Sequence, residues 1–278
     1  MLLSAHMSKK AHIIAVIGPT ASGKSAKAVE LAKERNGEVI SVDSRQVYRT
    51  LDIGTEKTSP QEMQGVPHHL IDIRDPEISY GAGDFVVDAT ALIQKLTDEG
   101  KTPILAGGTH FYFDALLYGL PGEPAHPELR KELEARSAES LFAELETRDP
   151  RRASRIDRHN KRRLVRALEI VQAHGSVPER ERGESAYDVK WVIVDLLKGD
   201  LRARIDARLA QAFERGLIEE VERTRARVGD ARLTELGLEY RVIGEFLRGE
   251  RTQASLLPTL SSRLWHYARQ QKAWLRKL

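Results

Sequence analysis

Residues 18–25, GPTASGKS, combine residue types that bind phosphate. They fit the pattern G-x-x-x-x-G-K-[ST], in which backbone N–H groups of a glycine-rich loop surround a phosphate and a lysine reaches its oxygens. The pattern indicates that a phosphate binds without indicating which molecule carries it. We predict that the loop contacts the phosphate through Gly18, Thr20, Ala21, Ser22, Gly23, Lys24 and Ser25.

The segments on either side of this loop indicate how it is held. Residues 12–17, HIIAVI, form a short apolar run that is typical of a buried parallel strand. Residues 26–32 are helix formers, with Val29 and Ala32 spaced to pack inward. A strand, a glycine loop and a helix start bring backbone N–H groups together at the positive end of the helix, where an anion binds.

Two other predicted strands end in polar groups. Residues 38–43 predict a strand that ends at Asp43, and residues 103–106 predict one that leads into a glycine turn and Thr109. Ligand groups gather at the carboxyl ends of strands in open α/β sheets, so both side chains should lie beside the phosphate loop. Asp43 could otherwise be a helix cap or the metal-holding aspartate of an ordinary NTPase, and Thr109 a simple turn residue.

Alternation of strands and helices continues to about residue 120 and predicts a parallel sheet. A third strand is expected at 68–73, helices at 84–99 and 111–117, and a returning strand at 190–196; four helices follow it. The fold class is therefore α/β, a P-loop NTPase-like parallel sheet flanked by helices, with an all-helical insertion. We expect a disordered lead-in or tag at 1–10, a catalytic core at 11–120 and 189–278, and a helical insertion at 121–188.

Charge is unevenly distributed along a chain whose net charge is only +3. Residues 148–166 hold nine Lys and Arg against two acids, and residues 262–278 hold five against none, which suggests a polyanion bound at defined places. Solvated helix faces are the alternative. Arg204 and Arg208 share a helix face, as surface residues or as a pair aimed at the phosphate.

Composition excludes some classes of protein. Without cysteine there are no disulfides and no cysteine–zinc sites. No apolar run approaches the roughly 18 residues of a membrane span, and we expect a cytoplasmic protein. We expect no metal at His68-His69, because neighbouring strand residues point to opposite faces and no third ligand is evident.

A phosphate loop alone favours an ATP-dependent kinase of a small molecule. The basic helical insertion instead favours a phosphate-bearing small substrate that meets a nucleic acid. Further motifs, in order along nearly the whole chain after residue 11, resemble the bacterial tRNA dimethylallyltransferases. They are Ile40–Tyr48 (ISVDSRQVY), Asp52–Thr55 (DIGT), Gly65–Asp72 (GVPHHLID), Asp84-Phe85, Gly107–Thr109, Arg163 with Arg166–Glu169, Arg204-Ile205 with Arg208, and Trp274–Arg276.

The resemblance implies transfer of a dimethylallyl group from dimethylallyl diphosphate to N6 of the adenine 3′ of the tRNA anticodon. The loop would then hold the diphosphate rather than ATP. Asp43 would accept the proton of the amine, Thr109 would orient the amine or the leaving oxygen, and Arg208, Lys24 and Mg²⁺ held by Ser25 would neutralise the diphosphate.

The resemblance also implies that a basic insertion and C-terminal helices grip the anticodon stem-loop of tRNA, with no membrane involved. We expect a monomer, because a stem-loop needs an open cleft. The residues expected to bind tRNA are Ser44, Gln46, Arg158, Arg162, Arg163, Arg166, Arg269 and Lys272.

The sequence departs from the family pattern in three places. His110 stands where the family has a glycine or a small or apolar residue, and is expected to alter the mouth of the site. Glu239 begins a segment that starts with glycine in the family. Two family arginines are missing from residues 264–271, where Arg263 and Lys272 could substitute. An adenylate isopentenyltransferase, a kinase and a nucleic-acid-binding protein with an inactive loop stay as alternatives.

Overall fold

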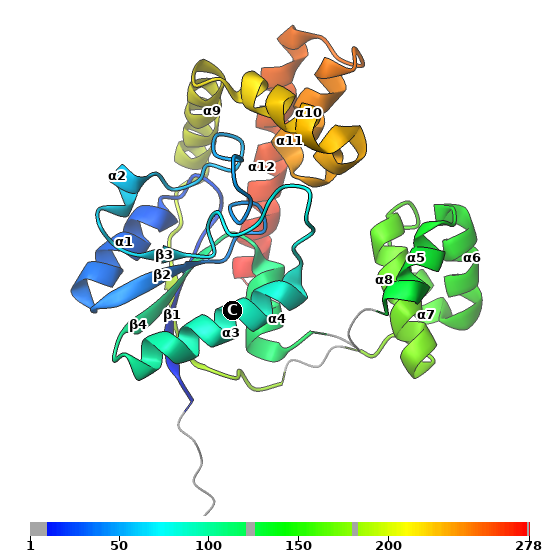
Figure 1. The fold of residues 1–278 in the computed structure, drawn as a ribbon, viewed down its shortest axis with the longest axis horizontal. Coiled ribbons are helices and arrows are strands. Elements are labelled where there is room, and N and C mark those ends of the chain that lie inside the picture. The colour runs from blue at the N-terminus through cyan, green and yellow to red at the C-terminus, as the bar shows by residue number, and fades with distance from the viewer. Residues whose placement is uncertain (1–9, 121–125, 180–182, 277) are drawn as a thin grey trace, which may run out of the picture. The chain divides into compact units, whose positions relative to one another are not determined.

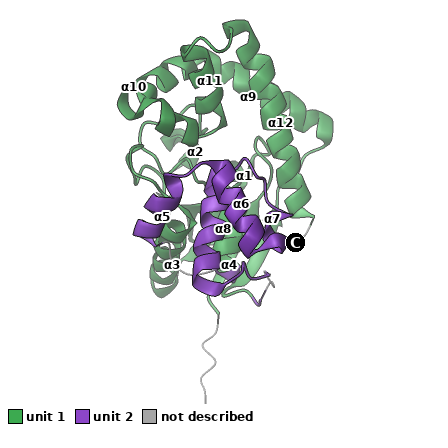
Figure 2. Cartoon of the chain, turned by 90° about the vertical axis from the view of Figure 1, so that its right-hand side faces the viewer, with its two compact units in different colours: residues 1–117, 185–278 green, residues 118–184 purple. Residues whose placement is uncertain are grey.

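The structure is a computed structural model that describes residues 10–120, 126–179, 183–276 and 278. The predicted disordered lead-in therefore lies, apart from Lys10, outside the described residues. The chain divides into two compact units, one formed by Met1–Leu117 with Ser185–Leu278 and the other by Tyr118–Glu184 (Figure 2). The sequence predicts an insertion at 121–188, slightly shifted from this second unit.

A parallel sheet forms the centre of the first unit (Figure 1). Within the described residues it has five strands in the order β3-β2-β4-β1-β5. Strand β1 lies between β4 and β5, pairing Ile14 with Ile104 on one side and with Lys190 on the other. The strands are β1 (His12–Ile17), β2 (Gly37–Ser41), β3 (His68–His69), β4 (Thr102–Gly107) and β5 (Asp188–Ile193).

Helices cover this sheet and extend beyond it. The side chains of β1, β2 and β4 are almost fully buried, as strands covered on both faces require. The first helices are α1 (Lys24–Glu34), α2 (Pro60–Met63), α3 (Ala82–Asp98) and α4 (His110–Tyr118). The last are α9 (Lys198–Glu214), α10 (Leu217–Glu235), α11 (Leu238–Leu247) and α12 (Leu256–Leu275), with a short 3-10 helix at Gln253–Ser255. The predicted α/β fold class is confirmed.

Several element boundaries differ from the sequence prediction. Strand β2 ends at Ser41, so Asp43 follows the strand rather than ending it. Strand β3 ends at His69 rather than residue 73, because Leu70 and Asp72 have positive φ values of 59° and 55° that an extended strand does not allow. Strand β5 ends at Ile193 rather than residue 196. Helix α10 is interrupted by a kink at Gly229, where φ is 75° and the backbone is not helical.

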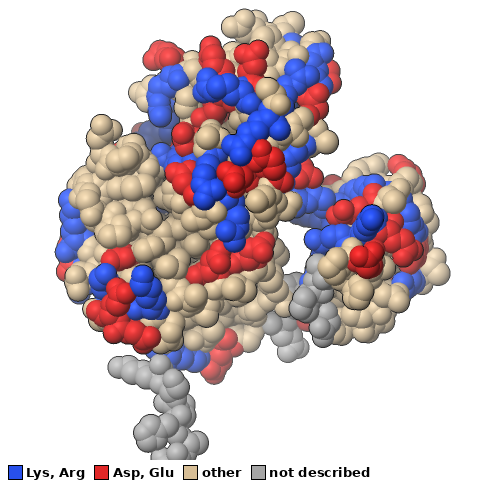
Figure 3. Space-filling view, viewed as in Figure 1, with Lys and Arg blue, Asp and Glu red and all other residues tan. Residues whose placement is uncertain are grey.

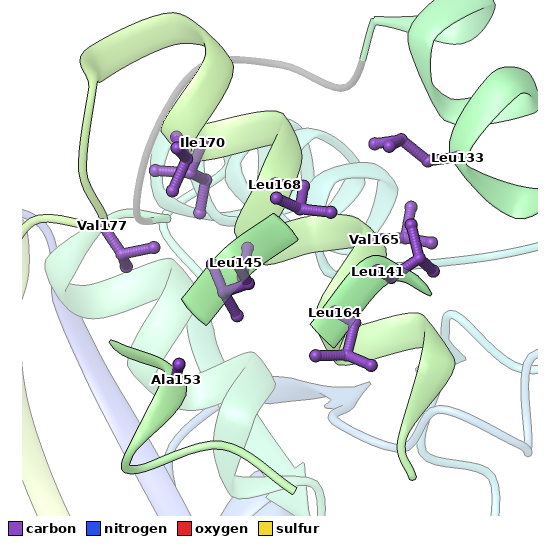
Figure 4. Close-up of a cluster of buried hydrophobic side chains, with 11 residues drawn as sticks. Leu133, Leu141, Leu145, Ala153, Leu164, Val165, Leu168, Ile170 and Val177 are labelled. Atoms are coloured by element: carbon purple, nitrogen blue, oxygen red, sulfur yellow. The ribbon is translucent and has the colours of Figure 1, made fainter. Parts of the chain in front are cut away.

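Every element assigned among the second unit's described residues is a helix. Its helices enclose a separate apolar core that includes Leu141, Leu145 and Leu168 (Figure 4). Asp149 starts α7 by accepting the Arg152 N–H at 2.9 Å. The helices are α5 (Pro127–Glu134), α6 (Ala138–Arg148), α7 (Pro150–Ala153) and α8 (Lys161–His174). In the described part of the chain, no helix is long and apolar enough to cross a membrane.

Candidate active site

The phosphate loop connects β1 to α1, as predicted. Gly23 adopts φ 92°, a left-handed conformation that glycine reaches without strain, directly before the first residue of α1. Gly18 lies where β5 ends, and a Cβ atom at this position would stand 2.3 Å from the Val194 carbonyl oxygen. The two glycines therefore let the loop turn tightly against the sheet and bring its N–H groups to the start of α1.

Two pockets open at the carboxyl edge of the sheet. The loop pocket, of about 520 Å³, lies over the phosphate loop and is lined by residues that include Lys24, Ser25 and Arg204. The helix pocket, of about 900 Å³, lies against α11 and α12, and its wall includes Thr109 and Glu239. Both pockets share Thr20, Asp43, Thr55, Glu56, Arg208 and Tyr267.

Asp43 is held in a fixed orientation between the two pockets. Its Oδ1 atom accepts the backbone N–H groups of Arg45 at 2.8 Å and Gln46 at 3.3 Å. The next residue, Ser44, donates its N–H to Thr109 Oγ1 at 3.1 Å. Because these bonds use Asp43 Oδ1 and a lone pair of Thr109, the second carboxylate oxygen and the hydroxyl hydrogen can serve a ligand.

Arg208 brings helix α9 onto the phosphate loop. Its Nη2 atom donates to Thr20 Oγ1 at 2.6 Å, and its Nε atom pairs with Glu56. Burial lowers the pKa of Lys24 below its ordinary 10.5, and the nearby Arg208 charge adds to this effect. Burial likewise raises the pKa of Glu56. Two cations close together in a partly dehydrated pocket favour a bound anion.

Helix α12 joins the loop to the second glycine turn through a residue that sequence reasoning gave no role. Gln271, which is 2% exposed, accepts the Thr20 N–H at 2.8 Å and donates to the Gly108 carbonyl oxygen at 3.0 Å. Tyr267, one turn earlier, also reaches this oxygen, at 3.4 Å. A glutamine late in a C-terminal helix has no local signal for such a contact, since its partners are far away in the sequence.

Three residues predicted to bind tRNA lie in or near these pockets. Ser44 lines the helix pocket, whereas Gln46 lines the loop pocket and donates to the carbonyl oxygens of Thr55 and Glu56 at 3.3 and 3.1 Å. Lys272 is bonded to Asp195 Oδ1 at 2.9 Å and to a backbone carbonyl oxygen. Gln46 and Lys272 thus have structural partners in place.

The predicted arginines of the insertion lie in the second unit. Arg162 and Arg163 are exposed in the first turn of α8. Arg166 is bonded to the buried carboxylate of Glu169 at 3.1 Å, and Arg158 lies 4.9 Å from the Phe142 ring centre. Basic and acidic side chains are interspersed on the face shown in Figure 3, so the insertion is not uniformly basic there.

Two departures from the family pattern have different environments. His110 lines neither pocket; it stacks on Trp274 at 4.2 Å with an interplanar angle of 5°, and burial lowers its pKa to about 4. His110 is therefore not part of the lining of either pocket, and its effect on the mouth of the site stays a prediction. Glu239 does line the helix pocket, where burial, with Glu56 and Asp43 nearby, raises its pKa to about 7.

The histidine pair has partners inside the protein. His68 Nδ1 is bonded to the Val66 carbonyl oxygen at 2.9 Å, and His69 Nε2 to Glu38 at 2.6 Å. Among the described residues, no group of three His, Cys, Asp or Glu side chains is placed to hold a metal ion. A metal ion in the loop pocket would therefore need ligands from a bound substrate as well.

These features define a class of protein. A parallel sheet carries a phosphate loop, an oriented carboxylate follows the neighbouring strand, and a second pocket meets the first at that carboxylate. This arrangement is that of a P-loop group-transfer protein with one pocket for a phosphorylated donor and another for an acceptor.

Comparison with known proteins gives the family. The family model described as IPP transferase matches residues 46–278, and the chain belongs to this family. The tRNA dimethylallyltransferase of Thermomicrobium roseum is 42% identical, over 98% of this chain and 85% of that protein. The enzyme of the same description from Anaeromyxobacter dehalogenans is 40% identical, over 95% and 92%.

Two solved structures of proteins with these activities are also similar to this chain in fold. The full-length tRNA isopentenylpyrophosphate transferase from Bacillus halodurans matches with a TM-score of 0.73 and 38% identity, covering 97% of this chain and 88% of that one. A eukaryotic dimethylallyltransferase acting on tRNA matches with a TM-score of 0.80 and 27% identity, covering 96% and 70%. The resemblance found in the sequence is confirmed.

Proposed function

We propose that this chain transfers a dimethylallyl group from dimethylallyl diphosphate to N6 of the adenine 3′ of the anticodon in tRNA, releasing diphosphate. Relatives that cover nearly the whole chain and are named tRNA dimethylallyltransferase support this function. The structural observation that carries it is the meeting of the loop pocket and the helix pocket at Asp43 and Arg208. A donor in one pocket and an acceptor in the other would react at this junction.

The loop pocket suits the diphosphate of the donor. Loop N–H groups at the start of α1, Lys24 and Arg208 present positive charge to it. As the allylic carbon separates from its oxygen, negative charge grows on the diphosphate. The two cations are already in place and need no reorganisation when this charge develops, so they stabilise the transition state more than the ground state.

The helix pocket suits the adenine. Its amine is a weak nucleophile, because the nitrogen lone pair is delocalised into the ring. In the proposed step, N6 forms a bond to the allylic carbon, the carbon–oxygen bond breaks, diphosphate leaves, and the N6 proton passes to Asp43. The oriented Asp43 carboxylate would contribute about 10²–10⁴-fold as a general base. Thr109 would orient the amine or the leaving oxygen.

We propose Mg²⁺ as the metal for this step. Ser25 and Glu56 give the loop pocket oxygen ligands, the type that Mg²⁺ prefers. Magnesium commonly takes one or two protein oxygens and completes its shell with substrate phosphates and water, which fits a pocket without a dedicated cage. Held by Ser25, the ion would neutralise charge on the departing diphosphate.

The second unit is proposed to hold the anticodon stem-loop. Arg158, Arg162 and Arg163 are exposed there, and backbone phosphates are the main source of affinity for such arginines. The adenine must leave its stack to enter the helix pocket. We propose that the enzyme acts as a monomer in the cytoplasm, where tRNA is found.

An acceptor assay tests the function. The protein is incubated with Mg²⁺, dimethylallyl diphosphate carrying a label in its allyl group, and unmodified tRNA, AMP or ATP. We expect label in tRNA alone, at the N6 atom of the adenine 3′ of the anticodon. Label in AMP or ATP would instead support an adenylate isopentenyltransferase. ATP turnover without label transfer would support a kinase, and binding without turnover an inactive loop.

A further inference from the structure

The buried carboxylate of Glu220 in α10 binds the backbone of a loop far away in the sequence. Its side chain is 3% exposed. Oε2 accepts the N–H groups of Asp52 at 2.9 Å and Ile53 at 2.7 Å, and Oε1 accepts the N–H of Gly54 at 2.9 Å. Three consecutive backbone donors on one carboxylate fix both the position and the direction of the 52–54 segment.

Tyr240 in α11 completes this arrangement. Its hydroxyl donates to Glu220 Oε1 at 2.7 Å, and burial together with the Glu220 charge raises the Tyr240 pKa well above 10, which keeps the donor proton in place. The Tyr240 ring also lies under the loop: a Cβ atom on Gly54 would stand 2.9 Å from it. The loop backbone therefore has no room to shift toward the ring.

This segment leads directly into the wall that both pockets share. Thr55 and Glu56 line the loop pocket and the helix pocket, and Glu56 pairs with Arg208. The Gln46 side-chain amide donates to the Thr55 and Glu56 carbonyl oxygens. Gln46 thus holds residues 55–56, and Glu220 holds residues 52–54.

We propose that Glu220 is a positioning residue for dimethylallyl transfer: it holds the 52–56 loop against α10 and α11 so that Arg208 and Asp43 keep their spacing at the pocket junction. Glu220 lines neither pocket. Its effect passes through the loop backbone to Glu56 and Arg208. This inference rests on the proposed function.

Glu220→Gln tests the role with little change in volume. The amide has only one oxygen, so its NH₂ group must face at least one of the donors that the carboxylate now satisfies. The loop should move, and small displacements of reacting groups cost up to about 100-fold in rate. We expect kcat to fall about 10- to 100-fold while KM for tRNA changes less than about 3-fold.

Glu38→Gln is the matched control. Glu38 is also a buried carboxylate, 8% exposed, with His69 and Lys101 as partners, and it lines neither pocket. The kcat of Glu38→Gln should stay within about 2-fold of wild type. This should hold even if Glu38→Gln and Glu220→Gln lower the melting temperature equally. Assays are run at a temperature where circular dichroism shows each variant fully folded.

A second variant keeps the test decisive if Glu220→Gln does not fold. Gly54→Ala retains Glu220 but places a methyl group against the Tyr240 ring, and should lower kcat at least about 10-fold. A folded Gly54→Ala protein with wild-type kcat overturns the proposal.

Equal kcat losses in Glu220→Gln and Glu38→Gln would also overturn the positioning role of Glu220. An effect of Glu220→Gln confined to KM for tRNA would overturn it too. These outcomes differ from failure of the proposed function. If the wild-type protein transfers no dimethylallyl group to tRNA, the function itself is wrong. If it transfers the group and Glu220→Gln is unimpaired, only the positioning role is wrong.

Discussion

Arg208 of helix α9 donates a 2.6 Å hydrogen bond from Nη2 to the hydroxyl of Thr20 in the phosphate loop, across 188 residues of sequence. Both residues line the loop pocket and the helix pocket. The guanidinium therefore stands where a diphosphate held by the loop would face an acceptor in the other pocket. Its other partner is the carboxylate of Glu56, which pairs with Nε.

We predict that Arg208→Ala lowers kcat about 100- to 1,000-fold, the usual cost of removing one preorganised charge from a transition state. Arg208→Lys should recover only part of this loss, because an ammonium group keeps the charge but lacks the planar fork. Steady-state kinetics with varied dimethylallyl diphosphate measure both variants. An Arg208→Lys enzyme with wild-type kcat would show that charge alone is sufficient.

Glu239 should make folding stability depend on pH. Its carboxyl pKa is raised from 4.5 to about 7 in the folded chain, chiefly by burial. The folded state holds the proton more tightly than the unfolded state, so this contribution to stability is present below pH 4.5 and is lost as the pH rises to about 7. Glu239→Gln should abolish this loss. Melting temperatures between pH 5 and 8 measure it; parallel curves for both proteins would exclude Glu239 as the source.

The charge of Glu239 should also affect how tightly the acceptor tRNA binds. Above pH 7 its carboxylate would lie in the helix pocket together with Asp43, Glu56 and Glu245, facing Arg208, Arg241, Arg263 and His266. A polyanionic tRNA entering this pocket meets the added negative charge. KM for tRNA should therefore rise between pH 6 and 8 in the wild type and rise less in Glu239→Gln.

Arg162 and Arg163 should contribute to tRNA affinity through phosphates. If each neutralises one phosphate, Arg162→Ala and Arg163→Ala should each reduce the slope of log affinity against log salt concentration by about 1. KM for dimethylallyl diphosphate should not change. Lys95→Ala is the control: Lys95 is exposed on α3 and lines neither pocket. Salt slopes unchanged from wild type in both arginine variants would remove α8 from the tRNA site.

The sequence predicts those parts of this molecule that depend on local patterns of residue types. The phosphate loop follows from residue types at fixed spacing, and the place of Asp43 follows from the end of an apolar strand, since parallel strands share a carboxyl edge. The strand predicted at 68–73 is too long, because Leu70 and Asp72 have positive φ values that their residue types do not predict.

The contacts that assemble the site lie beyond such patterns. In the sequence, Glu220 and Gln271 look like ordinary polar residues of amphipathic helices. In the structure, each is buried and binds backbone groups more than 150 positions away. These partners come together only when α10 and α12 fold onto loops that are far away in the sequence. His110 is the opposite case: an unusual residue beside a glycine turn whose ring packs on Trp274 and lines neither pocket.

The central claim is that Asp43 takes the N6 proton at the junction of the two pockets. Single-turnover transfer by Asp43→Asn, with tRNA and dimethylallyl diphosphate both saturating, tests it most directly. The amide preserves the acceptor for the Arg45 and Gln46 N–H groups, so tRNA binding should stay within about 3-fold of wild type. We predict a transfer rate at least about 100-fold slower. A transfer rate equal to that of the wild type would contradict the account.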